Sequence, residues 1–214
     1  LSIRRQRQMC IRDRSRQELG LAVLEGVHLA QAWLASEDLV ELFTTESGLA
    51  QPEIAAVIDM QLAVVPNTDL YILDDALWKK ISDLENAPPI MACVKIPNHT
   101  FPLTQRDDVL ILDGVQDAGN VGSMMRTAAA AGLSYVVCLK GTAQAWSPKV
   151  LRAAMGAHRH LRIFEAWSLN TVREKIKLPL IATSLMADTD LYDLGDELLL
   201  SLIHISEPTR LLSI

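Results

Sequence analysis

The chain has 214 residues, of which 50% are hydrophobic, and its formal net charge is −6 at pH 7. This length suits one medium domain or two small ones, and the acidic balance argues against broad, non-specific nucleic-acid binding, which needs many Lys and Arg side chains. The sequence shows no membrane-spanning run and no signal peptide, and its three cysteines fit neither a disulfide framework nor a metal-binding spacing. We therefore expect a protein of the reducing cytoplasm.

The two ends of the chain are related at the nucleotide level. If residues 9–13 are encoded by ATG TGT ATA AGA GAC and the codon of Arg14 begins with AG, the reverse complement is CTG TCT CTT ATA CAC AT. That string encodes residues 200–204 and begins the codon of Ile205. Such a relation is typical of one DNA adapter read in opposite orientations, so we expect residues 1–14 and 200–214 to be translated adapter. The alternative is that both ends are genuine protein, with a basic N-terminal arm that binds RNA.

Setting the ends aside changes the charge. The remaining chain keeps 14 of its 20 Lys and Arg residues and 24 of its 26 Asp and Glu residues, so its net charge is about −10. A local basic patch around a site is still compatible with this balance.

Residues 15–96 show the pattern of a small α/β domain. Residues 20–34 pass from a short apolar segment into an amphipathic helix. Further elements follow in chain order: strands at 39–44, 62–65 and 92–96, and helices near 51–59 and 74–84. Residues 97–106 contain two prolines among polar residues, so we expect a linker there.

Residues 107–199 alternate strands and helices more regularly. The pattern predicts strands at 109–112, 135–139, 162–164 and 180–183, and helices at 123–131, 148–157 and 168–176. Such alternation is typical of βαβ units with a parallel sheet. We therefore expect an α/β fold whose second domain is built on a parallel sheet.

The strand at 109–112 leads into a loop punctuated by Gly114, Gly119 and Gly122. Asn120 stands where a helix N-cap belongs, and Arg126 follows in the predicted helix. The spacing is neither the GxGxxG of a dinucleotide-binding fold nor the GK[ST] of a phosphate loop, which argues against a nucleotide-dependent oxidoreductase. On spacing alone, an ordinary strand–helix turn remains an alternative to a catalytic loop.

Two segments resemble the motifs of a known family. Residues 112–128 read LDGVQDAGNVGSMMRTA and resemble the first motif of the SpoU/TrmH family of RNA ribose 2′-O-methyltransferases, in the SPOUT superfamily. Residues 147–157 read SPKVLRAAMGA and resemble the second motif. The resemblance implies that residues 107–199 form the methyltransferase domain, whose C-terminal chain makes a trefoil knot. It also implies that residues 15–96 form a ribosomal-protein-like domain that binds the RNA substrate.

The resemblance assigns the chemistry to two residues of the first motif. Arg126 is expected to orient the ribose hydroxyl or a neighbouring phosphate, because a guanidinium is normally charged and suits positioning better than proton transfer. Asn120 is expected to contact the substrate or to shape the loop. The structural alternatives are a surface ion pair for Arg126 and helix capping alone for Asn120.

Further roles follow from the same resemblance. Binding of S-adenosyl-L-methionine is assigned to Thr183, Ser184 and Leu185, which follow the last predicted strand. Lys149 and Arg152 lie three residues apart on a predicted helix and are expected to contact RNA phosphates. A salt-bridged surface is the alternative for this pair.

The chain departs from the family at its third motif, a glycine-glutamate loop followed by a Ser-Leu-Asn turn, which is not found before residue 200. Ser168-Leu169-Asn170 spells the tripeptide but precedes the strand at 180–183, so we expect an ordinary helix start there. We therefore expect an incomplete knot, an incomplete cofactor site and a chain without activity. No metal is required, and His158 and His160 have no partner at ligand spacing.

The expected function is 2′-O-methylation of a ribose in ribosomal RNA, with S-adenosyl-L-methionine as methyl donor. Transfer RNA is the alternative substrate, and a catalytically silent RNA-binding protein on the same fold is the alternative function. The family also implies a homodimer.

Overall fold

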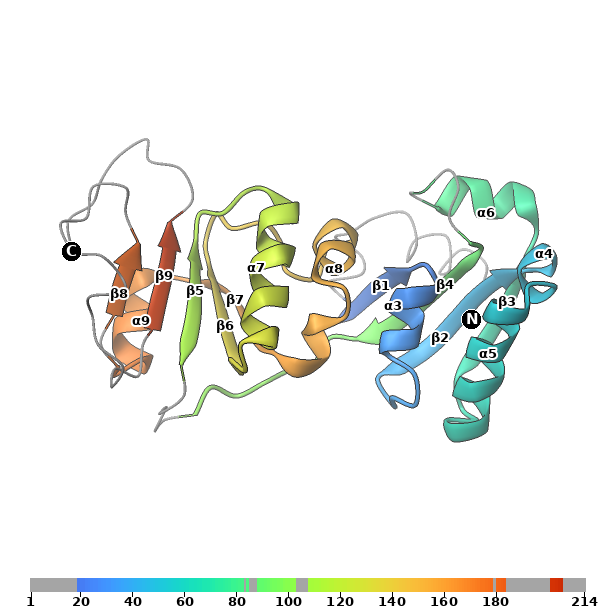
Figure 1. Ribbon diagram of the computed structural model, residues 1–214, viewed down its shortest axis with the longest axis horizontal. Helices are drawn as coiled ribbons and strands as arrows, with labels where there is room; N and C mark the ends of the chain where they lie inside the picture. Colours follow the sequence, from blue (N-terminus) through green and yellow to red (C-terminus); the bar gives the residue numbers. More distant parts are fainter. Residues whose placement is uncertain are drawn as a thin grey trace. The chain divides into compact units, whose positions relative to one another are not determined.

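The computed structural model describes residues 19–82, 84, 88–102, 108–178, 180–183 and 201–205. The chain divides into two compact units (Figure 1). Unit 1 comprises residues 1–98 and 146–156, and unit 2 comprises residues 99–145 and 157–214. Within the described ranges, no helix is both long enough and apolar enough to cross a membrane.

Unit 1 is built on a four-stranded mixed sheet. Its strands are β1 (Leu21–Glu25), β2 (Leu39–Thr45), β3 (Asp69–Leu73) and β4 (Ile90–Lys95), in the order β1-β4-β2-β3. β4 runs antiparallel to both β1 and β2, whereas β2 and β3 are parallel. The small α/β domain predicted for this half of the chain therefore forms.

Within the described ranges, unit 1 contains five helices: α3 (Val27–Ala32), α4 (Glu46–Leu49), α5 (Pro52–Val64), α6 (Asp75–Ile81) and α8 (Pro148–Ala154). Side chains cap the N-termini of α4 and α6. The Thr45 hydroxyl accepts from the Gly48 N–H at 3.0 Å, and the Asp74 carboxylate accepts from the Leu77 N–H at 2.8 Å. Pro52 occupies the first turn of α5, where a missing N–H costs nothing.

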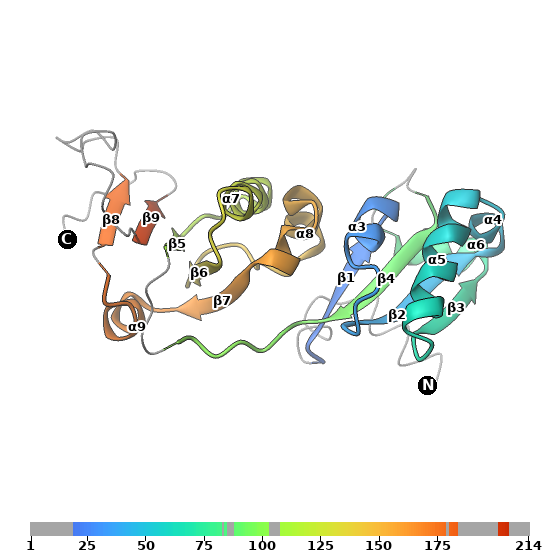
Figure 2. The same ribbon diagram turned by 60° about the horizontal axis from the view of Figure 1, so that its bottom comes forward.

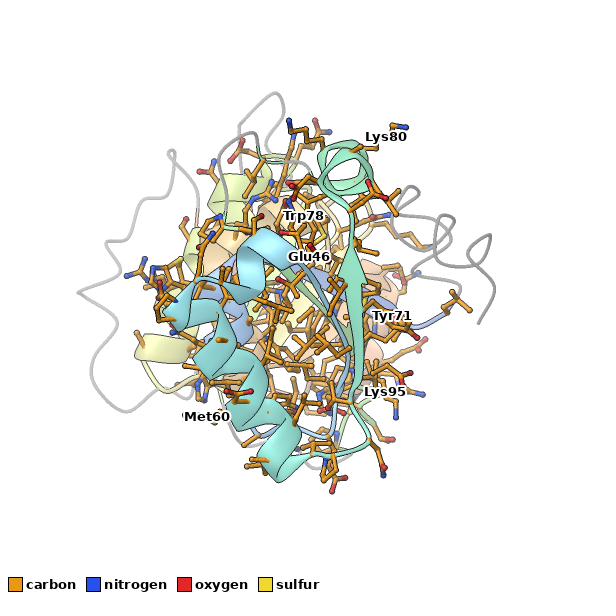
Figure 3. The ribbon with its side chains drawn as sticks, turned by 90° about the vertical axis from the view of Figure 1, so that its right-hand side faces the viewer. Glu46, Met60, Tyr71, Trp78, Lys80 and Lys95 are labelled. Atoms are coloured by element: carbon orange, nitrogen blue, oxygen red, sulfur yellow. The ribbon has the colours of Figure 1, made fainter. Side chains whose placement is uncertain are left out.

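The strand predicted at residues 62–65 is wrong. Residues 62–64 continue α5, with Val65 as its C-cap, and the strand comes later, at Asp69–Leu73. The helix buries Ile54, Val57, Ile58 and Gln61 at helical spacing. The apolar run at 62–65 is mostly the exposed end of this helix, beyond the outward-pointing Met60 (Figure 3). A short apolar run has no period of its own, so helix and strand cannot be told apart there.

Helix α6 covers one face of the unit 1 sheet. Its Trp78 packs with Val23, Phe43, Met91 and Cys93, and Tyr71 stacks on Phe43 with ring centroids 5.1 Å apart. Figure 3 shows Trp78 beneath α6 and Tyr71 on β3.

Helix α8 packs inside unit 1 through a close approach at Gly156. This residue has a φ of +86°, and a Cβ added to it would lie 2.6 Å from the Cβ of Ala32 on α3. Beside it, Trp146 meets Trp33 edge-on, with ring centroids 6.2 Å apart. The glycine is therefore needed both for its backbone conformation and for the missing side chain.

We expect Gly156→Ala to lower the free energy of unfolding by about 2–4 kcal/mol, because strain from the positive φ adds to overpacking against Ala32. Gly132→Ala is the matched control, since Gly132 has a φ of +84° but a Cβ added there would meet open space. Urea unfolding followed by Trp fluorescence measures both losses. Equal losses in the two variants would show that the contact with Ala32 contributes nothing.

Unit 2 is built on a five-stranded sheet in which every pairing is parallel. Its strands are β5 (Val109–Asp113), β6 (Tyr135–Leu139), β7 (Arg162–Trp167), β8 (Leu180–Thr183) and β9 (Ser201–Ile205), in the order β7-β6-β5-β9-β8. Helices α7 (Ala118–Ala130) and α9 (Leu169–Lys175) lie on opposite faces of this sheet, and a 3-10 turn, η1 (Ala157–His160), precedes β7 (Figure 2). The predicted α/β class with a parallel sheet is confirmed.

Parts of two segments that the sequence set apart from both domains belong to unit 2. Within residues 97–106, predicted as a linker, Phe101 is buried in the core of unit 2 with Tyr135, Phe164 and Trp167. Ser201–Ile205, from the segment expected to be adapter, forms β9 between β5 and β8. The adapter origin and the completeness of the knot stay predictions, since residues 184–200 and 206–214 lie outside the described ranges.

Candidate active site

Helix α7 carries the residues of the first motif, and it starts earlier than predicted. Its N-cap is Asp117, whose Oδ1 accepts a hydrogen bond from the Asn120 N–H at 2.7 Å. The prediction that Asn120 caps the helix is therefore wrong, because an acidic side chain three residues earlier takes that position. Asn120 lies in the first turn instead, and its side chain is exposed. Its proposed contact with substrate stays a prediction.

Arg126 lies on the exposed side of α7. Asn120, Ser123, Arg126 and Thr127 are exposed, whereas Val121, Gly122, Met125 and Ala128 are buried. Within the described part of the chain, the Arg126 guanidinium makes no hydrogen bond or ion pair. The helix therefore presents a cation and an amide on one solvent-facing side.

The loop before α7 follows β5, where the sheet changes its direction of winding. From β5 the chain proceeds through β6 to β7 on one side, and β9 and β8 lie on the other. Ligands of open parallel sheets bind outside the carboxyl ends of strands at such a point. Gly114 has a φ of +66°, and a Cβ added to it would meet no atom of the described residues within 4 Å, so none of these residues blocks a close approach to the backbone there.

A second loop, residues 140–145, is bonded to this first one. The Thr142 hydroxyl donates to the Leu112 carbonyl at 2.9 Å, and the Ala143 N–H donates to the Val115 carbonyl at 2.8 Å. A Cβ on Gly141 would lie 3.9 Å from the Cα of Gly114. The loops after β5 and β6 therefore form one hydrogen-bonded layer at the carboxyl edge of the sheet.

The far end of the second loop is held by two side chains that sequence reasoning did not single out as functional. The Ala145 N–H donates to Glu165 Oε1 at 2.7 Å, and its carbonyl lies 2.8 Å from His158 Nε2. Because a carbonyl only accepts, Nε2 carries the imidazole proton. Burial lowers the pKa of His158 to about 4, although the bond to Ala145 opposes the shift.

Two more groups near this peptide have shifted pKa values. Burial raises the pKa of the Glu165 carboxyl, and the Ala145 N–H partly offsets that effect. Burial, with a smaller contribution from Glu165, raises the pKa of the Cys138 thiol to about 12. Cys138 is therefore a neutral thiol at physiological pH and unsuited to nucleophilic chemistry.

We expect His158 to make the protein less stable in mild acid. Its folded pKa of about 4 lies below the ordinary value of 6.5, so the unfolded chain binds the extra proton and stability falls as the pH drops through this window. Between pH 7 and pH 5 the loss should be about 2 kcal/mol greater in the unchanged protein than in His158→Gln. Urea unfolding at both pH values measures it, and His160→Gln, at an exposed position, should retain the full loss.

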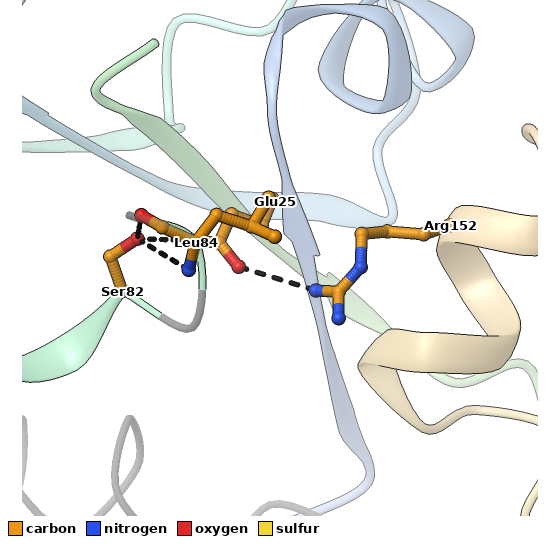
Figure 4. A network of polar contacts seen from close by, with 4 residues as sticks. All are labelled: Glu25, Ser82, Leu84 and Arg152. Atoms are coloured by element: carbon orange, nitrogen blue, oxygen red, sulfur yellow. Dashed lines mark hydrogen bonds and ion pairs between the residues drawn. The ribbon is translucent and has the colours of Figure 1, made fainter. Parts of the chain in front are cut away.

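The second motif supplies Lys149 and Arg152 on α8. Lys149 is exposed, but Arg152 is half-buried and its Nη1 lies 3.3 Å from Glu25 Oε2 on β1 (Figure 4). The other carboxylate oxygen of Glu25 accepts the hydroxyl of Ser82, which also bonds the backbone of Leu84. An ion pair was the structural alternative for Arg152, and it forms with an unpredicted partner. Contact of either side chain with RNA stays a prediction.

The residues assigned to the cofactor lie mostly outside the described ranges. Thr183 ends β8, at the same edge of the sheet as the loops after β5 and β6, and nothing is described of Ser184 and Leu185. Asn120 and Arg126 belong to unit 2, whereas Lys149 and Arg152 belong to unit 1. Ser168 caps α9 by accepting from the Thr171 N–H at 3.1 Å, which confirms that Ser168-Leu169-Asn170 is an ordinary helix start.

Comparison with known proteins agrees with the motif loop and the parallel sheet. Residues 108–211 match the model of the SpoU rRNA Methylase family. The chain contains a SpoU methylase domain. It is 33% identical over 141 residues to the 23S rRNA (guanosine(2553)-2′-O)-methyltransferase RlmP of Bacillus subtilis, covering 66% of this chain and 52% of that protein. It is 43% identical over 101 residues to human mitochondrial rRNA methyltransferase 3, covering 44% of this chain and 24% of that protein.

The fold of the SpoU domain and the preceding unit is found in solved structures. The SpoU methyltransferase AviRb from Streptomyces viridochromogenes, in complex with the cofactor AdoMet, superposes with a TM-score of 0.76 at 18% identity, covering 99% of this chain and 83% of that one. The family therefore includes members that bind S-adenosyl-L-methionine. The chain spans about half or less of the length of the two sequence relatives given above.

Proposed function

We propose that this protein methylates the 2′-hydroxyl of a ribose in ribosomal RNA, with S-adenosyl-L-methionine as methyl donor. The observation that carries the proposal is the exposed Arg126 on the helix that follows the open glycine loop of β5, in a domain of the SpoU family. The two sequence relatives described above are both named as rRNA methyltransferases, and one of those names specifies the 2′-O position.

The chemistry asks for positioning more than for a strong nucleophile. The donor supplies an activated methyl group on its sulfonium, and the protein must hold the ribose hydroxyl in line with it and help the proton leave. Arg126 fits this task because its charged, forked guanidinium can hold a hydroxyl oxygen or an adjacent phosphate in a fixed direction. Asn120, on the same exposed side of α7, can add an amide contact.

The carboxyl edge of the unit 2 sheet offers backbone that a cofactor can approach closely. Gly114 and Gly141 place bare backbone side by side after β5 and β6, and a Cβ on Gly114 would meet no described residue within 4 Å. Thr183 ends β8 at the same edge, so Thr183, Ser184 and Leu185 are the residues we propose to hold S-adenosyl-L-methionine. Among the described residues, no cluster of three metal-ligating side chains is present.

Ribosomal RNA is the substrate that the names of both relatives favour, and transfer RNA remains an outcome of the test. We further propose a cytoplasmic homodimer, with unit 1 and the exposed Lys149 contacting RNA. A catalytically silent RNA-binding protein on the same fold is the second candidate, and it is an outcome of the test described below.

The test is transfer of a labelled methyl group from S-adenosyl-L-methionine to unmodified ribosomal RNA or transfer RNA. A 2′-O-methyl group leaves the adjacent phosphodiester resistant to alkali, so alkaline hydrolysis separates ribose methylation from base methylation. Alkali-resistant label in ribosomal RNA supports the proposal, and label in transfer RNA alone changes the substrate. Binding to RNA without any transfer would favour the silent alternative.

The same assay should include the product of the gene recovered from the source DNA. If residues 1–14 and 200–214 are translated adapter, reads across Ser15 and Leu199 will diverge from the codons of both segments. We propose that the recovered gene then supplies a glycine-glutamate loop and a Ser-Leu-Asn turn, and that its product is active where the 214-residue chain is not. Reads that continue through residue 214 would overturn the adapter origin.

A further inference from the structure

The segment that leads into α7 is anchored by its own buried Val115, by the capping side chain of Asp117 and by a second loop of the chain. Residues 113–117 connect β5 to the N-cap of α7 and include Gly114, which has an open side and a positive φ. Two hydrogen bonds described above come to this region from the second loop: Thr142 donates to the Leu112 carbonyl in β5, and the Ala143 N–H donates to the Val115 carbonyl within the segment. The position of α7, and so of Arg126, therefore depends on where the loop of residues 140–145 lies.

That second loop is itself fixed at Ala145. Two side chains from later in the chain bind the backbone polar groups of Ala145. Glu165 accepts from its N–H, and His158 donates to its carbonyl. His158 is 2% exposed, and Glu165 is half-buried, so both bonds are shielded from bulk water. Thr142, Ala143 and Ala145 thus link the β7 region to the loop after β5.

Glu165 reaches Ala145 because β7 is irregular at this point. The register between β6 and β7 shifts between Val137, paired with Phe164, and Leu139, paired with Trp167. The extra residue is absorbed at Ala166, which has a φ of +58° although it is not a glycine. Bulges redirect side chains, and non-glycine residues with positive φ persist only where the surroundings hold them. The bulge directs Glu165 toward the Ala145 peptide.

His158 reaches the same peptide from η1, which contacts α7. The turn therefore touches both the helix that carries Arg126 and the loop that supports the start of that helix. We propose that Glu165 and His158 are positioning residues, which hold the Ala145 peptide and thereby fix the motif loop and Arg126 for methyl transfer. The inference rests on the proposed function, and it adds two residues that neither motif segment includes as a catalytic position.

Amide hydrogen exchange tests the inference without requiring activity. Glu165→Ala should speed hydrogen exchange of the Ala145 and Ala143 amides by roughly tenfold or more. The variant removes the acceptor of the Ala145 N–H, and it frees the loop that holds the Ala143 N–H against the Val115 carbonyl. Glu165→Gln keeps an acceptor oxygen and should restore slow exchange. Glu174→Ala, at an exposed position on α9, is the matched control and should leave both amides unchanged.

Methyl transfer by the product of the recovered gene gives the second readout. Glu165→Ala should lower kcat about tenfold with little change in KM, and Glu165→Gln should recover most of it, since a displaced catalytic group slows reaction more than binding. If Glu165→Ala unfolds, the same comparison is made at His158. His158→Asn keeps a side-chain donor and His158→Leu removes it. Unchanged Ala145 exchange in Glu165→Ala or His158→Leu overturns the inference. Absence of transfer in every protein, the unchanged one included, counts against the proposed function and leaves the exchange result to decide the positioning role.

Discussion

Replacing Arg152 with Met should lower the free energy of unfolding of unit 1 by about 3 kcal/mol, because it leaves a buried carboxylate without its counter-ion. The Glu25 side chain is 3% exposed and the Arg152 side chain 26% exposed, so the ion pair is largely removed from water. Ser82 still donates to Glu25 in the variant, but one hydroxyl cannot compensate a buried negative charge.

The asymmetry of exposure predicts an order among the variants. Glu25→Gln should cost less than Arg152→Met, since the neutral amide can keep the Ser82 bond and Arg152 can turn toward water. The double variant should be more stable than the sum of the two losses predicts, with a coupling of roughly 1 kcal/mol or more. Lys149→Met, on the exposed side of the same helix, is the control and should change stability by less than about 0.5 kcal/mol.

Urea unfolding followed by the fluorescence of the Trp33–Trp146 pair reports on this part of the molecule, since those rings meet 6.2 Å apart in unit 1. If Arg152→Met is as stable as the unchanged protein, the pair contributes nothing, and Arg152 is free for phosphate contact as the second motif suggested. If the loss is as large as expected, Arg152 acts first as an anchor for α8, and Lys149 is left as the cation that α8 offers to RNA.

Four of the five strands of the unit 2 sheet were predicted, because their apolar runs give strong local signals, and the expected bounds of β8, Leu180–Thr183, are the observed ones. The fifth strand, β9, was not predicted, because it lies in the segment interpreted as adapter. The end of α5 was mistaken for a strand because four apolar residues carry no usable period. Asn120 was taken for the N-cap because Asn and Asp are equally good caps and the glycines around them hid the true helix start.

The contacts that hold the candidate site could not be predicted in the same way. Glu25 and Arg152 are 127 residues apart, and only the folded unit shows that each completes the other. Glu165 reaches Ala145 from an irregular part of β7, and His158 bonds the Ala145 carbonyl from 13 residues along the chain, a separation that no motif marks. The motif resemblance pointed to exposed residues such as Arg126, whereas the buried polar contacts become visible only when the backbone is in place.

In the product of the recovered gene, replacing Arg126 with Ala should lower kcat for methyl transfer by roughly 100-fold or more, the usual cost of losing one group that stabilises or orients the reacting atoms. KM for the methyl donor should change little, because the proposed donor contacts lie at the end of β8. Stability should change by less than about 0.5 kcal/mol, since the side chain is exposed and makes no polar contact within the described part of the chain. Arg173→Ala, which removes an exposed arginine from α9, is the matched control and should keep full activity.

Arg126→Lys separates charge from geometry at this position. A lysine keeps the positive charge but loses the planar fork, so activity that recovers fully in Arg126→Lys would mean that charge alone is needed. We expect recovery of less than about a tenth, because holding a hydroxyl in line requires direction as well as attraction. Equal loss in Arg126→Ala and Arg173→Ala would point to general RNA binding by surface cations and would remove Arg126 from the catalytic role. A loss confined to position 126 would mean that the exposed side of α7 faces the ribose, and the bonded loops after β5 and β6 would then set the distance across which the methyl group moves.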